Sequence, residues 1–246
     1  MEKIEWQIVR LQETSSTNTY LDNLDIAEEQ CEGCVVTTHT QSAGRGQRGN
    51  TWEAEPGKNL TFSYLLRPVC VAPQEQFVIS QAVSLAMIDV LSRYADGFTI
   101  KWPNDIYYRD SKIAGILIEH NLSGMTISRT IVGIGLNINQ KEFVSDAPNP
   151  ISLSRVTGVE YDLDKLLNEI LEATTIRYRE CCTDRARLQQ DYAEVLYRKN
   201  GFYTYRDAQG AFEAIIKGVQ PDGFLILEDS DGCERRYAFK EVAFVI

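Results

Sequence analysis

The residues best suited to chemistry in this sequence lie in one glycine-rich segment, QSAGRGQRGNTWEAEPGK at 41–58. Its glycines allow the backbone to approach a ligand closely and to adopt positive φ angles. Arg45 and Arg48 carry planar guanidinium groups that match the oxygens of carboxylate and phosphate. The segment therefore predicts a loop that binds an anion, although the same composition also suits a plain hairpin loop between two strands.

A second cationic candidate is Lys112, which begins the strand-like run KIAGILIEH. In regular alternation Lys112 shares one face of this strand with residues 114, 116 and 118, which are Ala, Ile and Ile. A lysine at the start of an apolar face either extends into water beyond the strand end or contacts a ligand. Gly115, three residues later, would let the backbone pass close to that ligand.

Three further polar segments accompany these cations, ETSSTN at 13–18, KWPND at 101–105 and GIGLNIN at 133–139. The Ser/Thr run of the first can begin a helix near 17–24 as an N-cap, and its hydroxyls can also bind a ligand. WPND is a good turn between strands, and it also offers side-chain oxygens of the kind that Mg²⁺ prefers. The GxG of the third segment is weak evidence for a nucleotide, because no helix follows it.

In this order and at these separations, the five segments resemble the catalytic core of the biotin protein ligases, over roughly residues 6–246. The resemblance implies an α+β fold of the class II aminoacyl-tRNA-synthetase-like type with a mixed central sheet. It implies a catalytic domain at 1–198 and a small SH3-like β-barrel at 199–246. The implied enzyme forms biotinyl-5′-AMP from biotin and ATP with Mg²⁺ and transfers biotin to a lysine of a biotin carboxyl carrier protein. No permanently bound structural metal is expected.

The resemblance also assigns ligand contacts to positions of this sequence. Catalysis is assigned to Lys112, Arg45 and Arg48, and Lys112 would contact both the substrate carboxylate and the phosphate. Contacts to biotin are expected from Ser16, Thr17, Asn18, Gln41, Gly44, Arg45, Gly46, Gln47, Trp52, Lys112 and Gly115. Contacts to ATP are expected from Arg45, Arg48, Lys101, Asn104, Lys112 and Asn137, with Asp105 expected to bind Mg²⁺ beside the nucleotide. Gly133 and Gly135 would underlie the adenine and ribose.

The sequence departs from the family's usual pattern inside the glycine-rich loop. Gln47 stands where the family usually has a further arginine, and Asn50 replaces a residue that is commonly basic. Both changes bear on how tightly the loop retains the reactive adenylate. Where some relatives place an aromatic residue against adenine, this sequence has Pro150 and Ile151, so the adenine contact is unassigned.

Composition limits the other possibilities for this chain of 246 residues. Its formal net charge is −10, which argues against broad attraction to nucleic acid or anionic lipid, so neither partner is expected. The chain has no apolar stretch long enough to span a bilayer, and MEKIEWQIVRLQ lacks a signal pattern, so we expect a cytoplasmic protein. In that setting the six cysteines are expected to be free thiols. Cys31 and Cys34 lack the second ligand pair that a zinc site needs.

The apolar pattern predicts the elements that must position these groups. The run 75–94 is apolar over most of its circumference and predicts a buried helix that packs against a sheet. Short connections between later strands favour antiparallel or mixed pairing. The expected elements are strands at 6–12, 34–41 and 59–68, strands in FTIKW, IYY, KIAGILIEH and RTIVGIGLNI, a long surface loop at 140–158, a broken helix from 163 toward 198, and short strands after 200.

Other functions fit parts of this pattern. A lipoate ligase or octanoyl transferase would share the fold, but these families lack KWPND and have a different glycine-rich signature. A biotin-responsive repressor needs a DNA-binding domain, for which we expect no room before the strand that begins near Trp6. A non-catalytic biotin-binding module would not need Arg45, Arg48 and Lys112 together. We expect a monomer or a homodimer.

Overall fold

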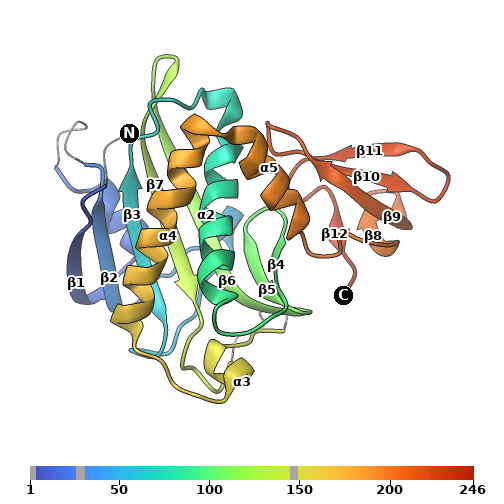
Figure 1. Ribbon diagram of the computed structural model, residues 1–246. Helices are drawn as coiled ribbons and strands as arrows, with labels where there is room; N and C mark the ends of the chain where they lie inside the picture. The colour runs from blue at the N-terminus through green and yellow to red at the C-terminus, as the bar shows by residue number, and fades with distance from the viewer. Residues whose placement is uncertain (1–3, 26–30, 145–148) are drawn as a thin grey trace.

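The structure is a computed structural model that describes residues 4–25, 31–144 and 149–246 (Figure 1). The first sheet comprises β1 (Gln7–Thr14), β2 (Cys34–Gln41), β3 (Leu60–Leu66), β4 (Phe98–Lys101), β5 (Asp105–Tyr108), β6 (Ser111–Ser123) and β7 (Thr126–Leu136). The helices are α1 (Thr17–Asp22), α2 (Phe77–Leu91), α3 (Leu153–Thr157), α4 (Leu163–Thr183) and α5 (Arg185–Glu194), with short 3-10 turns η2 (Gln47–Gly49) and η3 (Pro73–Glu75). The second sheet comprises β8 (Tyr203–Asp207), β9 (Gly210–Val219), β10 (Leu225–Asp229), β11 (Glu234–Tyr237) and β12 (Ala243–Phe244).

The seven strands of the first sheet pair in the order β1-β2-β3-β7-β6-β5-β4. β1 pairs with β2 in parallel, and every other pairing in this sheet is antiparallel. The second sheet has the order β11-β10-β9-β8-β12 and is antiparallel throughout. The α+β class, the mixed central sheet and the hairpin-connected strands are therefore confirmed.

Helices α2 and α4 cover one face of the first sheet (Figure 1). Nearly every side chain of α2 is buried, which confirms the helix expected from the apolar run. None of the helices in the described ranges combines the length and the apolar character that crossing a membrane requires. The expected break in the next helix is also confirmed, because Asp184 separates α4 from α5 and accepts a hydrogen bond from the Arg187 amide as an N-cap.

The two faces of the first sheet differ in the size and polarity of their side chains. On β3, Phe62 and Tyr64 belong to the hydrophobic core, whereas Thr61 and Ser63 alternate with them and lie on the other face. Ile134 on β7 likewise belongs to the core, while Gly133 and Gly135 flank it. The face away from α2 and α4 therefore carries short and polar residues, which leave room for a site.

The segment 140–158 is more regular than the sequence predicts. Residues 145–148 lie outside the described residues, but Leu153–Thr157 form α3. The Ser152 side chain accepts a hydrogen bond from the Arg155 amide at the start of α3, and Gly158 ends the helix with φ of 83°. The expectation of an irregular loop is therefore wrong for this last part, where a serine cap and a C-terminal glycine define one short helix.

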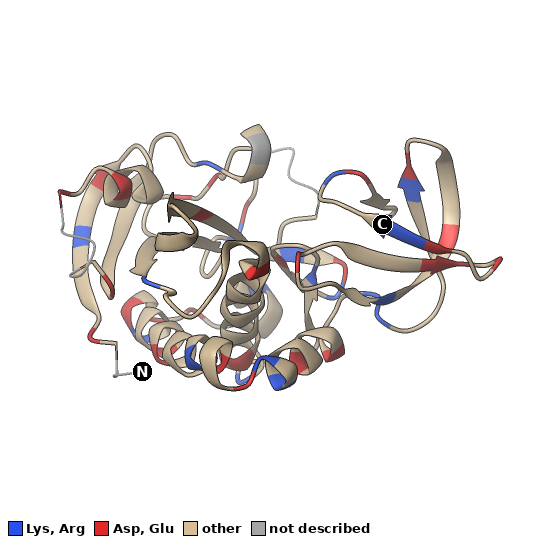
Figure 2. Cartoon of the chain, turned by 90° about the horizontal axis from the view of Figure 1, so that it is seen from above, with Lys and Arg blue, Asp and Glu red and all other residues tan. Residues whose placement is uncertain are grey.

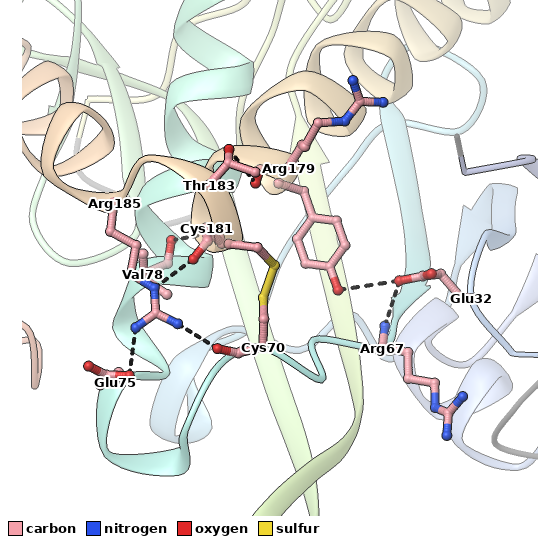
Figure 3. Close-up of a disulfide and its surroundings, with 11 residues drawn as sticks. Glu32, Arg67, Cys70, Glu75, Val78, Arg179, Cys181, Thr183 and Arg185 are labelled. Atoms are coloured by element: carbon pink, nitrogen blue, oxygen red, sulfur yellow. Dashed lines mark hydrogen bonds and ion pairs between the residues drawn. A yellow bond between two sulfur atoms is a disulfide. The ribbon is translucent and has the colours of Figure 1, made fainter. Parts of the chain in front are cut away.

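The expectation of free thiols is wrong for one pair of cysteines. A disulfide joins Cys70 to Cys182, which lie 112 residues apart in the sequence with a Cα–Cα distance of 5.7 Å (Figure 3). Beside it, Arg185 donates to the carbonyl oxygens of Cys70 and Cys181 and pairs with Glu75 at 2.6 Å. The end of α4 packs against the segment after β3, and this tertiary contact brings together two cysteines that sequence spacing cannot pair.

Candidate active site

A cavity of about 470 Å³ lies on the short-residue face of the first sheet, between the glycine-rich segment and the second sheet. Its lining joins the segments that the sequence singles out, although they are far apart along the chain. The predicted residues that line it are Ser16, Thr17, Asn18, Gln41, Arg45, Gly46, Gln47, Trp52, Lys101, Asn104, Asp105, Lys112 and Gly115. Gly133 and Gly135 also contribute to the wall. The structure therefore collects most of the expected contacts around one space.

Three of the expected contacts are not among the described lining residues. Gly44 is buried within the glycine-rich segment, where an added Cβ would overlap the carbonyl oxygen of Trp52. Asn137 is buried, and its amide donates to the carbonyl oxygen of Ile151 at 3.2 Å. The backbone of Arg48 lies in η2, and its side chain is outside what the structure describes.

Lys112 reaches the cavity because of a β-bulge in β6. Ile106 on β5 pairs with Ala114, but the next residue, Tyr107, pairs with Lys112, so β6 contains one extra residue, Ile113. A bulge of this kind turns the side chains on either side of it. The expectation that Lys112 shares a face with residues 114, 116 and 118 is therefore wrong, since Ala114 lies in the core and Lys112 lies beside Gly115.

The surroundings of Lys112 form a cationic end of the cavity. Its Nζ lies 2.7 Å from Oδ1 of Asp105 and 5.7 Å from the centre of the Trp52 ring. Lys101 lies nearby, with its Nζ 3.3 Å from the Tyr107 hydroxyl. Burial lowers the pKa of Lys101, Asp105 opposes this shift, and Lys112 adds to it. An anion at this end would therefore stabilise the charged form of Lys101.

A chain of hydrogen bonds links the polar residues at the opposite end. Gln41 Oε1 accepts from the Thr17 amide at 2.9 Å, and the Ser63 hydroxyl lies 2.7 Å from Thr17 Oγ1 and 2.6 Å from Asn18 Oδ1. Ser16 occupies the N-cap position of α1, but in the described structure its side chain makes no cap hydrogen bond. The predicted start of a helix at the Ser/Thr run is therefore confirmed, and the Ser16 side chain is buried in the cavity wall.

The glycines of β7 are required by side chains that lie against them. A Cβ at Gly135 would overlap the indole of Trp52, and a Cβ at Gly133 would overlap the side chain of Asn18. These glycines therefore let Trp52 and Asn18 lie close to the sheet. Trp52 Nε1 is buried and has no hydrogen-bond partner among the described residues, so a ligand oxygen could accept from it.

Strand β12 and the loop that precedes it supply a wall that sequence reasoning missed. Phe239, Lys240, Val242, Ala243 and Phe244 all line the cavity. They meet the KWPND turn, where Trp102 Nε1 donates to the carbonyl oxygen of Gly223 at 2.9 Å and the Trp102 ring lies 6.3 Å from that of Phe239. In the sequence, only Trp102 indicated that the KWPND turn packs against another part of the chain, because a tight turn does not itself need a large apolar residue.

The charge of the site is set by local pairs. Acidic and basic residues are interspersed along the helices and over the C-terminal strands (Figure 2). At the cavity, Asp105 pairs with Lys112, and Glu119 pairs with Arg45 at 3.1 Å. Among the described residues, no three His, Cys, Asp or Glu side chains gather closely enough to hold a metal ion. Near the cations the available oxygens are those of Asp105 and Asn104, whose amide nitrogen donates to Ile116.

Comparison with known proteins agrees with this geometry. The family model for the biotin/lipoate A/B protein ligase family matches residues 11–137, just over half of the chain. The chain belongs to this family. Within it, the bifunctional ligase/repressor BirA of Bacillus subtilis (strain 168) is 29% identical over 219 residues, 84% of this chain and 65% of that protein. The biotin–acetyl-CoA-carboxylase ligase of Paracoccus denitrificans is 33% identical over 173 residues, 66% of this chain and 69% of that protein.

Solved structures of the biotin/lipoate ligase family share the fold. The biotin protein ligase from Aquifex aeolicus in complex with biotin and ATP superposes with a TM-score of 0.76 at 22% identity, covering 96% of this chain and 97% of that chain. The Leishmania major enzyme in complex with biotinyl-5-AMP gives 0.66 at 21% identity, covering 94% and 98%. The chain spans just under two-thirds of the Bacillus subtilis relative, at 65% of its length.

Proposed function

We propose that this chain is an ATP-dependent biotin ligase that forms biotinyl-5′-AMP and transfers biotin to a lysine of a biotin carboxyl carrier protein. The observation that carries the proposal is the polarity of the cavity from one end to the other. Thr17, Asn18 and Gln41 form a neutral polar end, Trp52 forms an apolar wall, and Lys112 stands at a cationic end. Biotin has the same order of groups, from ureido ring through tetrahydrothiophene and alkyl chain to carboxylate. The names of the relatives support the same activity.

Recognition of biotin would begin at the polar end. A ureido carbonyl needs donors, and its two N–H groups need acceptors, so hydroxyl and amide side chains suit both sides of the group. Ser16, Thr17, Asn18 and Gln41 supply these groups in the cavity wall. The indole of Trp52 offers a flat apolar surface for the fused ring or the alkyl chain, and the absence of a side chain at Gly115 leaves space beside it.

Adenylation joins two anions, so the enzyme must reduce their repulsion. A carboxylate oxygen of biotin forms a bond to the α-phosphorus of ATP while the bond from phosphorus to pyrophosphate breaks. Lys112, Lys101 and Arg45 line the cavity where cations can contact the carboxylate and phosphates. Asn104, Arg48 and Asn137 remain proposed ATP contacts. Asp105 and the Asn104 oxygen would hold Mg²⁺ together with phosphate and water oxygens, and the ion would neutralise phosphate charge.

Transfer to the carrier protein follows when its lysine amine attacks the acyl carbon of the mixed anhydride and AMP leaves. The glycine-rich loop would protect this anhydride from water, and Gln47 in place of an arginine gives one fewer cation to retain it. We further propose that residues 1–198 form the catalytic domain and 199–246 a small β-barrel, which agrees with a second sheet built from β8 to β12. We propose a cytoplasmic monomer or homodimer without a nucleic-acid partner.

The test is ATP–pyrophosphate exchange measured with biotin, with lipoate and with octanoate as the only acyl substrate. We expect exchange with biotin alone, followed by transfer of biotin to a purified carboxyl carrier domain. Exchange stimulated by lipoate and not by biotin would replace the proposal with a lipoate ligase. Biotin binding without exchange, in protein that is folded by circular dichroism, would indicate a binding module.

A further inference from the structure

Glu119 contacts two residues of the proposed biotin site, Asn18 and Arg45, from outside the cavity. It is not among the described residues that line the cavity, but it lies on β6 behind the glycine-rich segment. One carboxylate oxygen, Oε2, accepts from Asn18 Nδ2 at 2.7 Å and from Arg45 Nη2 at 3.1 Å. Asn18 and Arg45 do line the cavity. A single oxygen therefore joins the polar wall to the loop.

We propose that Glu119 is a positioning residue that orients Asn18 for biotin and holds Arg45 and its loop over the site. The proposal rests on the biotin ligase function proposed above. Gly115, Leu117 and Glu119 alternate along β6 on the face away from the core, which brings the carboxylate to the same side as Asn18. The Leu117 carbonyl oxygen supplies a second, longer contact to Asn18 Nδ2 at 3.4 Å.

The bond to Glu119 fixes which end of the Asn18 amide donates. Because a carboxylate can only accept, Asn18 Nδ2 faces Glu119 and Asn18 Oδ1 must accept from Ser63 at 2.6 Å. The Ser63 hydroxyl also lies 2.7 Å from Thr17 Oγ1, and the Thr17 hydroxyl donates to Gln41 Oε1 at 3.3 Å. Glu119 therefore sets the orientation of the Asn18 amide within this hydrogen-bonded wall, and a ureido group distinguishes donors from acceptors.

The ion pair with Arg45 ties the loop to the sheet. Within the loop, Gly46 donates to the Asn50 carbonyl oxygen at 2.7 Å and Trp52 donates to that of Gly44 at 3.0 Å, so these bonds close the loop on itself. The pair of Arg45 and Glu119 instead connects it to β6. Their side chains are 46% and 36% exposed, so the pair contributes little to folding, and its loss should appear mainly in the rate at which the loop releases its ligand.

Two substitutions separate these roles. Glu119→Gln keeps an acceptor for Asn18 and loses the ion pair, so we expect the KM for biotin within about twofold of native and release of biotinyl-5′-AMP about three to five times faster. Glu119→Ala loses both contacts, so we expect the KM for biotin to rise about tenfold while kcat for adenylate formation changes less than about threefold. Release is measured by chasing preformed radiolabelled adenylate from the protein. Glu234→Gln, an exposed change on β11, is the matched control.

The decisive measurement repeats the chase in an Arg45→Gln background. If Glu119 acts through Arg45, adding Glu119→Gln to this background should not accelerate release further. Additive acceleration would overturn the proposal, as would Glu119→Gln with native release. Glu119→Gln nearly preserves the size of the side chain, so it remains a test even if Glu119→Ala fails to fold. ATP–pyrophosphate exchange by the native protein is measured before any variant is compared. If biotin does not stimulate that exchange, the result refutes the ligase function instead.

Discussion

Replacing Lys112 by alanine tests the adenylation chemistry most directly. Its Nζ contacts Asp105 at 2.7 Å and lies over Trp52, and the side chain is 24% exposed. The substitution removes one cation from the end of the cavity where the carboxylate and the α-phosphate would meet, and it leaves Asp105 as an uncompensated negative charge. Both changes oppose the approach of two anions.

The expected loss can be estimated from contacts of similar geometry. Removing one preorganised donor to a transition-state oxyanion slows the reaction about 100- to 1000-fold, or about 3–4 kcal/mol. Two unit charges about 4 Å apart near a protein surface interact by about 4 kcal/mol, which agrees with that range. A partly exposed pair such as Lys112 and Asp105 contributes only about 1 kcal/mol to folding. Lys112→Ala should therefore lose adenylation while it retains the fold.

The assay is biotin-dependent ATP–pyrophosphate exchange at saturating substrates, with thermal unfolding measured on the same samples. Lys112→Met shows whether packing against Trp52 matters apart from charge, and it should be as inactive as Lys112→Ala. Lys217→Ala, on β9 in the second sheet, provides a matched lysine control and should remain active. Exchange by folded Lys112→Ala within about threefold of native would refute the role of Lys112 in charge stabilisation.

Three further predictions follow from the packing. Gly135→Ala should weaken biotin binding in calorimetry by about tenfold or more, because its Cβ would displace Trp52. Cys182→Ser should lower the urea-measured free energy of unfolding by up to about 5 kcal/mol, and the difference should vanish when dithiothreitol opens the disulfide to Cys70 in native protein. Burial lowers the pKa of His120 to about 4, so stability should fall by about 2 kcal/mol as pH drops from about 6.5 to 4, because the unfolded chain binds the proton first. His120→Gln should remove that part of the loss in unfolding measured at pH 7 and pH 4.5.

Local patterns predicted most of the fold because the features that define it are local. The apolar run of α2 needed no partner to be recognised as a buried helix, and the short connections around β4 to β7 allowed only hairpins. The resemblance of the motifs, in their order, to those of the biotin protein ligases predicted that Thr17, Gln41, Asp105 and Lys112 line one site. Each of these residues lies in a short motif that can be recognised in the sequence without knowing its tertiary contacts.

The features that the sequence could not predict depend on what each residue meets after folding. The bulge at Ile113 arises from the pairing of β5 with β6, and it changes the face of Lys112 without any glycine or proline to mark it. The bond between Cys70 and Cys182 depends on where α4 ends against a distant segment. Glu119 looked like an ordinary residue near a strand end, and only the contacts to Asn18 and Arg45 give it a role.

The KWPND turn explains why the cavity needs both sheets. Trp102 is buried against two loops of the second sheet, through Gly223 between β9 and β10 and Phe239 after β11, while Asp105, three residues later, contacts Lys112. Ile100, just before the turn, exchanges backbone hydrogen bonds of 2.8 Å with the segment after α5. One short stretch therefore docks the C-terminal strands and presents the acidic partner of the proposed catalytic lysine. Because the turn is held on both sides, displacement of the second sheet would remove a wall of the cavity and free the backbone that positions Asp105.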